Sequence, residues 1–209
     1  MAVYILNQTF LYMRKLNLIA IVGLVFIGTS AFAQEAAFGL KGGLNLSEIK
    51  IDDPEASYNS KTGYHAGIFV RSKFNKVAIQ PELLLYTQRG DFSGPGYSGN
   101  EDFTYLTIPL MVKFYPVMGL NFQVGPQFGF LLDGERTTNA LGTTIKRDIK
   151  DQYESNDFAV SAGAGYDFPF GLSLDARYNI GVKDINNAAN GDEAKSRVFL
   201  ISIGWNFLN

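Results

Sequence analysis

Cysteine is absent from the 209-residue sequence, and histidine occurs once, at His65. The lack of thiols excludes disulfides, cysteine nucleophiles and cysteine-ligated metals, and a single histidine leaves no multi-histidine metal site. Charged residues are also sparse, at 18% against about 25% in an ordinary soluble domain. The formal net charge of −2 argues against a protein that binds nucleic acid through a basic surface.

The sequence has one long apolar run, and it lies near the N-terminus. A basic pair at residues 14–15 precedes apolar residues 16–27, and residues 31–33 (AFA) form a small-x-small cleavage site. The run is shorter than the roughly 20 residues that a spanning helix needs. This pattern predicts a cleaved signal peptide over residues 1–33, in which residues 1–12 are consistent with translation from an upstream start codon.

Aromatic residues and glycine are plentiful, which favours a β-rich fold. The clearest strand pattern lies at residues 172–183, where Leu174 and Tyr178 share one face while Asp175 and Arg177 share the other. Period-2 alternation predicts eight strands in all, at residues 38–47, 64–71, 77–90, 104–114, 120–132, 157–168, 172–183 and 197–207.

The predicted connections alternate between short and long. Short turns fall at residues 72–76, 116–119 and 169–171, and long polar loops fall at residues 50–63, 91–102, 133–156 and 184–196. Short turns at one end and long loops at the other are typical of outer-membrane barrels. We therefore expect an all-β fold over residues 34–209, namely an eight-stranded antiparallel up-and-down transmembrane β-barrel exported to the outer membrane.

A secreted, soluble lipocalin-like barrel that binds a ligand is the competing fold. The two folds differ in which face of each strand is apolar. Here the apolar face carries large side chains such as Phe122 and Trp205, whereas the other face carries glycine and polar residues. A narrow barrel accommodates bulky groups outside and small or polar groups inside, so this pattern favours the membrane barrel. Pro81, Pro109 and Pro126 fall inside predicted strands, where we expect bulges or strand starts.

Eight sequence blocks also resemble a known family. They are GLKGGLNLS (39–47), GYHAGIF (63–69), IQPELLLYTQRG (79–90), YLTIPLMVKFYP (105–116), QVGPQFGFLL (123–132), GAGYDF (163–168), LDARYNIGVKDIN (174–186) and VFLISIGWNF (198–207). Together they resemble the porin-family or PorT-like outer-membrane β-barrel proteins of Gram-negative bacteria. The resemblance implies an outer-membrane barrel of eight strands, and it implies no agreed reaction, ligand or cofactor.

Four charged residues are predicted to meet inside the barrel. Glu82, Lys113, Asp175 and Arg177 fall on the polar face at similar heights above the short turns. Charges in a narrow interior are costly unless they are paired. We therefore expect a structural ion-pair cluster that closes the lumen, with Glu82 and Lys113 as the pair to test.

No catalytic, cofactor or metal site is predicted. The carboxylates at residues 52–53, 91 and 101–102 have no EF-hand spacing and are interpreted as a solvated loop surface. His65 lies on the polar face, and a barrel enzyme that uses it as a base is the alternative function. The main expectation is a non-enzymatic structural or interaction role, in membrane integrity, adhesion or secretion, and not a general diffusion pore.

Three classes of partner are expected. The first is outer-membrane lipid, and the second is the barrel-assembly machinery, which reads an aromatic-x-aromatic ending such as residues 205–207 (WNF). The third is a protein that binds the loops at residues 50–63, 91–102, 133–156 and 184–196. Nucleic acid is not expected as a partner.

Overall fold

The computed structural model describes residues 35–48, 57–94, 96–140, 143–150, 156–182 and 197–207. The expected signal peptide at residues 1–33 lies outside these ranges. The described strands are β1 (Glu35–Glu48), β2 (Ser57–Phe74), β3 (Val77–Gly94), β4 (Tyr97–Phe114), β5 (Leu120–Ala140), β6 (Thr143–Asp148), β7 (Asn156–Asp167), β8 (Leu172–Gly181) and β9 (Arg197–Asn206). No helix in the described part of the chain is long and apolar enough to cross a membrane.

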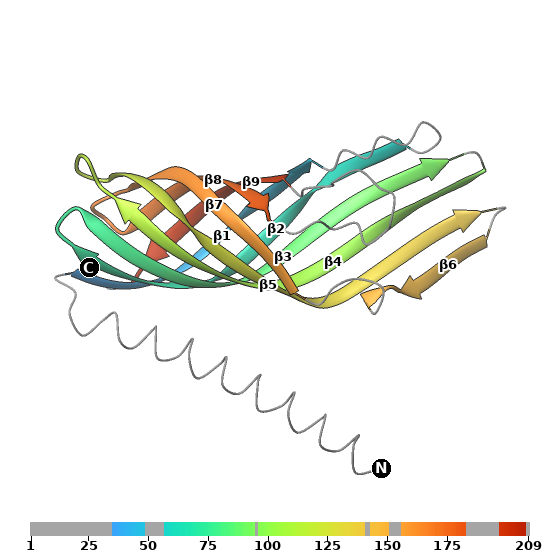
Figure 1. The fold of residues 1–209 in the computed structure, drawn as a ribbon, viewed down its shortest axis with the longest axis horizontal. Helices are drawn as coiled ribbons and strands as arrows, with labels where there is room; N and C mark the ends of the chain where they lie inside the picture. Colours follow the sequence, from blue (N-terminus) through green and yellow to red (C-terminus); the bar gives the residue numbers. More distant parts are fainter. Residues whose placement is uncertain are drawn as a thin grey trace, which may run out of the picture.

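Eight of the described strands close into a barrel (Figure 1). The order β4-β3-β2-β1-β9-β8-β7-β5 runs through antiparallel neighbours, and pairing of β4 with β5 completes the ring. Strand β6 pairs with β5 outside this ring. The predicted eight-stranded antiparallel barrel is therefore confirmed, and β6 is an addition within the expected loop at residues 133–156.

The turns between paired strands are tight at one end of the barrel. Asn75, Gly119 and Gly171 adopt positive φ angles of 54°, 79° and 96° at these turns. Glycine reaches this region without a steric penalty, and asparagine tolerates it. The amide of Asn206 donates to the carbonyl of Gly171 at 2.9 Å, which places the end of β9 beside the β7–β8 turn. The last strand thus ends at the short-turn end.

The polarity of the two strand faces is the reverse of that in a soluble protein. On β8, Leu174 is 41% exposed while its neighbour Asp175 is 3% exposed. The same alternation runs along β9 and the N-terminal half of β5. Apolar side chains therefore cover the outside and polar side chains fill the lumen, as an outer-membrane barrel requires. A soluble lipocalin-like barrel would bury its apolar face, so that alternative is wrong.

Four strands extend into segments that were predicted as long loops. The expected loop at residues 91–102 is mostly a continuation of β3 and β4, which pair as far as Gly94 and Tyr97. Residues 57–63 belong to β2, and residues 133–140 belong to β5. The prediction of polar loops there is wrong. These strand extensions carry polar residues on both faces, so no alternation of apolar and polar residues marks them as strands. The expected loop at residues 184–196 lies outside the described residues.

The three strand prolines produce no bulge. Pairing of β3 with β4 keeps one register on both sides of Pro81 and Pro109, although the residues between Pro81 and Leu84 have no ladder partners on β4. The register of β5 with β7 is continuous through Pro126. The expected bulges are therefore misplaced, because the register shifts instead fall between residues 61 and 65 of β2 and at residues 104–105 of β4.

Candidate functional site

An ion-pair cluster occupies the lumen. Arg177 on β8 reaches Glu82 on β3 through two bonds, from Nη1 to Oε2 at 2.7 Å and from Nη2 to Oε1 at 2.6 Å. Lys113 on β4 lies 3.3 Å from Asp175 Oδ1 on β8. All four side chains are at most 4% exposed. The structure therefore brings the four predicted residues together, in two acid–base pairs.

Lys41 on β1 joins these two pairs, and the sequence reasoning missed it. Its Nζ lies 2.9 Å from Glu82 Oε1 and 2.7 Å from Asp175 Oδ2. None of the ion pairs in the described residues connects Glu82 directly with Lys113, so choosing these two as the test pair was wrong. Alternation could have found Lys41. It directly follows Leu40, which faces outward, so its side chain points into the lumen.

Uncharged side chains complete the cluster. The amide nitrogen of Gln123 donates to Asp175 at 2.7 Å, and its oxygen accepts from Arg177 Nε at 2.8 Å. Gln80 donates to Glu82 at 2.6 Å. Hydrogen bonds of this kind compensate buried charges for part of their lost hydration. The cluster thus spans β1, β3, β4, β5 and β8, and it ties opposite walls of the barrel together.

Glycines on the inner face make room for these long side chains. A Cβ atom at Gly163 would lie 2.2 Å from the carbonyl oxygen of Ala176 and 3.0 Å from Arg177 Cγ. A Cβ atom at Gly165 would lie 2.3 Å from Asp175 Oδ1. Since real Cβ atoms do not approach so closely, alanine at either position would displace the cluster.

A second charged layer lies at the short-turn end of the lumen. Arg71 pairs with Asp167 at 2.5 Å, and the hydroxyl of Tyr115 donates to the same carboxylate at 2.6 Å. Lys113 lies 3.8 Å from Asp167, so the two layers are connected. Together they place four cations opposite three carboxylates.

His65 lies on the other side of the ion-pair cluster. Its Nδ1 is 2.6 Å from Asn45 Oδ1, and its Nε2 is 2.8 Å from Ser202 Oγ. This is the order of a nucleophile, a base and a group that orients the base. All three side chains are at most 2% exposed, so the arrangement is a buried hydrogen-bonded chain.

An apolar layer separates His65 from the long-loop end. Tyr86, Val198 and Leu200 form a buried cluster, and Tyr105 packs against it. Tyr86 is the ladder partner of His65, and Leu200 is two residues from Ser202. The layer therefore closes the lumen directly above the hydrogen-bonded chain.

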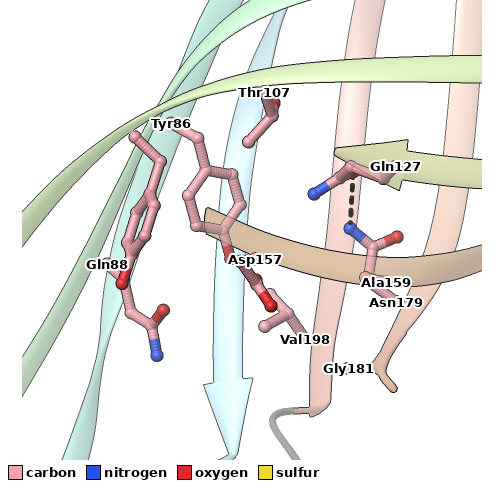
Figure 2. A pocket seen from close by; sticks show the side chains of 10 residues that line it. Tyr86, Gln88, Thr107, Gln127, Asp157, Ala159, Asn179, Gly181 and Val198 are labelled. Atoms are coloured by element: carbon pink, nitrogen blue, oxygen red, sulfur yellow. Dashed lines mark hydrogen bonds between the residues drawn. The ribbon is translucent and has the colours of Figure 1, made fainter. Parts of the chain in front are cut away.

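A small cavity opens above this apolar layer, at the mouth of the barrel (Figure 2). Its volume is about 30 Å³, and its walls include Tyr86, Tyr105, Gln127, Asp157 and Asn179. Asn179 Nδ2 donates to Gln127 Oε1 at 3.0 Å across one wall. A cavity of this size holds a few small molecules such as water, which need roughly 10–15 Å³ each.

Beyond the mouth, five strands continue as a projecting sheet. We use this name for residues 57–61 of β2, 88–94 of β3, 97–104 of β4 and 133–140 of β5, together with β6; β1 pairs with β2 only as far as Thr62. In Figure 1 this sheet extends past the ends of β1 and β9. Each neighbouring pair of strands carries one ion pair: Lys61–Asp91, Arg89–Asp102, Glu101–Arg136 and Glu135–Lys146.

The projecting sheet includes three of the carboxylates considered for a metal site. Asp91, Glu101 and Asp102 each pair with a cation on a neighbouring strand, whereas residues 52–53 lie outside the described residues. Within the described ranges, no three His, Asp or Glu side chains are grouped as metal ligands. The carboxylates of this sheet therefore act as cross-strand partners.

Several solved structures are similar to this chain. The crystal structure of Ail, the attachment invasion locus protein of Yersinia pestis, is similar with a TM-score of 0.50 and 17% identity, over 83% of this chain and 100% of that chain. Neisserial surface protein A has a TM-score of 0.48 and 13% identity, over 83% of this chain and 100% of its own. OprG from Pseudomonas aeruginosa has a TM-score of 0.46 and 14% identity, over 85% and 98%.

At 17% identity, the similarity to Ail concerns the fold and not the function. No curated protein sequence matches this chain. A family model described as "Outer membrane protein beta-barrel domain" matches residues 32–187, which is more than half of the chain. The chain therefore belongs to this family of Gram-negative outer-membrane β-barrels.

Proposed function

We propose that this protein is a closed outer-membrane barrel with an interaction role, and that the projecting sheet is its binding surface. The observation that carries the proposal is the combination of a filled lumen with a sheet that extends beyond the membrane-facing apolar band. Adhesion and service to a secretion machine are both forms of this role. The resemblance of the sequence to porin-family or PorT-like proteins does not choose between adhesion and secretion.

The filled lumen argues against a general diffusion pore. Ion pairs close the barrel at two levels, and Tyr86, Val198 and Leu200 close it at a third. An eight-stranded barrel has an interior just wide enough for its own side chains. Transport of a solute would require breaking the bidentate bond between Arg177 and Glu82 and leaving both charges unpaired.

The projecting sheet favours interaction over a purely structural role. Short turns of such barrels face the periplasm, so the sheet faces the outside of the cell. Backbone ladders join every pair of neighbouring strands in it and hold the surface in one shape, and one exposed ion pair for each strand pair adds to them. All six side chains of β6 are exposed. A pre-formed surface loses less entropy on binding than a flexible loop.

Export is expected to follow the sequence pattern. We propose that a signal peptide over residues 1–33 is removed, that assembly machinery inserts the chain, and that outer-membrane lipid covers the apolar outside. N-terminal sequencing of protein purified from outer membranes tests this. A mature chain that starts near Gln34 supports cleavage after Ala33, and a chain that retains residues 1–33 contradicts it.

Two measurements test the proposed role. Planar bilayers that contain the purified protein should show no steady conductance, and a large steady conductance would contradict the closed lumen. A photoreactive residue at Ile145 on β6 should give a discrete protein adduct in intact cells, whereas one at lipid-facing Val124 should not. Equal adducts at both positions, or none at Ile145, would contradict binding through the projecting sheet.

The hydrogen-bonded chain of Ser202, His65 and Asn45 supports a second candidate, a barrel hydrolase. Its weakness is access, because Ser202 is 2% exposed and lies below the apolar layer. A fluorophosphonate probe, which labels activated serines, decides between the two functions. We expect no labelling of the folded protein; labelling that disappears in Ser202→Ala would favour the enzyme.

A further inference from the structure

The mouth cavity contains one acceptor atom that lacks a donor and one carboxylate that lacks an ion pair. Asn179 is 5% exposed, and within the described residues no donor reaches its Oδ1 atom. Asp157 lines the same cavity, and none of the ion pairs of the described residues includes its carboxylate. Buried polar atoms are normally hydrogen-bonded, so an orphaned acceptor beside an unpaired carboxylate calls for a donor.

The cavity walls also favour a positive charge. The tyrosine rings of Tyr86 and Tyr105 line the cavity, with centroids 6.3 Å apart in an edge-on arrangement. Aromatic faces attract cations through their quadrupole. Gln127 and Asn179 hold each other in place at 3.0 Å, so the orphaned oxygen has a fixed position. Figure 2 shows this amide pair and Asp157 on the walls of one hollow.

We infer that the mouth cavity is a binding site for a primary ammonium group. Such a group carries a positive charge for Asp157 and three N–H donors, of which one suits Asn179 Oδ1. The volume of about 30 Å³ admits a methylammonium-sized group and excludes a sugar or a nucleotide. A quaternary ammonium has no N–H donor, and an anion would be repelled by the carboxylate.

The cavity borders the projecting sheet at Gln88. Its two acceptor groups, Asp157 and Asn179, lie on β7 and β8 outside that sheet, so the site can exist whether or not the sheet binds a protein. The ammonium group has two sources outside the cell, either a free amine or a lysine side chain of another protein. Both present the same chemistry at the cavity. The site is open to either because Asp157 is exposed at the mouth.

NMR titration of the folded protein in lipid nanodiscs tests the inference. Methylammonium chloride should shift the side-chain amide signal of Asn179 saturably, while potassium chloride and tetramethylammonium chloride at equal ionic strength should not. Asp157→Asn should weaken binding about tenfold or more, because a charge-assisted hydrogen bond is lost. Asp133→Asn removes the same charge from an exposed position on β5 outside the cavity walls and should leave the affinity unchanged.

Three results would overturn the site. The first is an absence of saturable binding, which would mean that water alone fills the cavity. The second is an equal shift of the Asn179 signal with all three cations. The third is an equal loss of affinity in Asp157→Asn and Asp133→Asn. Nα-acetyl-lysine N-methylamide separates the sources. Binding as tight as that of methylammonium indicates a lysine side chain, and weaker binding indicates a free amine; either result presupposes the site.

Discussion

Arg177 and Glu82 face each other across the lumen in a bidentate pair, with bonds of 2.7 and 2.6 Å. They come from β8 and β3, which are not neighbours in the barrel. The pair therefore connects two walls that no backbone ladder joins. Because both side chains are at most 4% exposed, the two hydrogen bonds of the pair must offset the free-energy cost of removing both charges from water.

Arg177→Ala should strongly destabilise the barrel. The change leaves Glu82 with Lys41 as its remaining cation, and breaking a buried pair typically lowers the free energy of unfolding by roughly 3–5 kcal/mol. Urea unfolding in lipid vesicles measures this loss. Arg89→Ala is the matched control, since its pair with Asp102 is exposed and such pairs contribute about 0.2–1 kcal/mol.

A double-mutant cycle on Arg177 and Glu82 separates pairing from general damage. The double variant should lose less free energy of unfolding than the sum of the single variants, because neither charge is then left alone. Strictly additive losses would contradict direct pairing.

Arginine at Val124 and at Gln123 should act by different mechanisms. Val124 is 53% exposed on the outer face, so Val124→Arg should cost roughly 2–4 kcal/mol if it lies near the bilayer midplane. Gln123 is buried and bonds Asp175 and Arg177, so Gln123→Arg acts by crowding. Stability should depend on bilayer thickness for Val124→Arg alone. Thickness-independent losses of equal size at both positions would refute the assignment of the two faces.

The hairpin of β5 and β6 should be sensitive to acid. On the projecting sheet, the hydrogen bond from Lys146 at 2.8 Å and its charge lower the pKa of Glu135 below its ordinary value. A lowered folded-state pKa gives stability that is present above the ordinary pKa and is lost as the pH falls through the folded value. Hydrogen exchange of the β6 amides should therefore accelerate in acid.

Carboxyl NMR titration of Glu135 measures its pKa directly. In Lys146→Ala the pKa of Glu135 should return towards its ordinary value. An identical pKa in both proteins would show that Lys146 has no effect on this carboxylate.

The sequence alone determined the barrel and its two faces. A period of two specifies which residues share a face, and the inversion of polarity specifies that apolar side chains meet lipid. Glu82, Lys113, Asp175 and Arg177 could be placed in the lumen for this reason. Lys41 was equally predictable, because the same alternation runs through β1.

Only the tertiary structure decided which charges meet. Alternation places a residue inside but does not give the stagger of strands around a closed ring, which sets the neighbours across the lumen. Glu82 therefore meets Arg177 and Lys41, and Lys113 meets Asp175. His65 likewise bonds Asn45, 20 residues away, and Ser202, 137 residues away, because ring closure brings β1, β2 and β9 side by side.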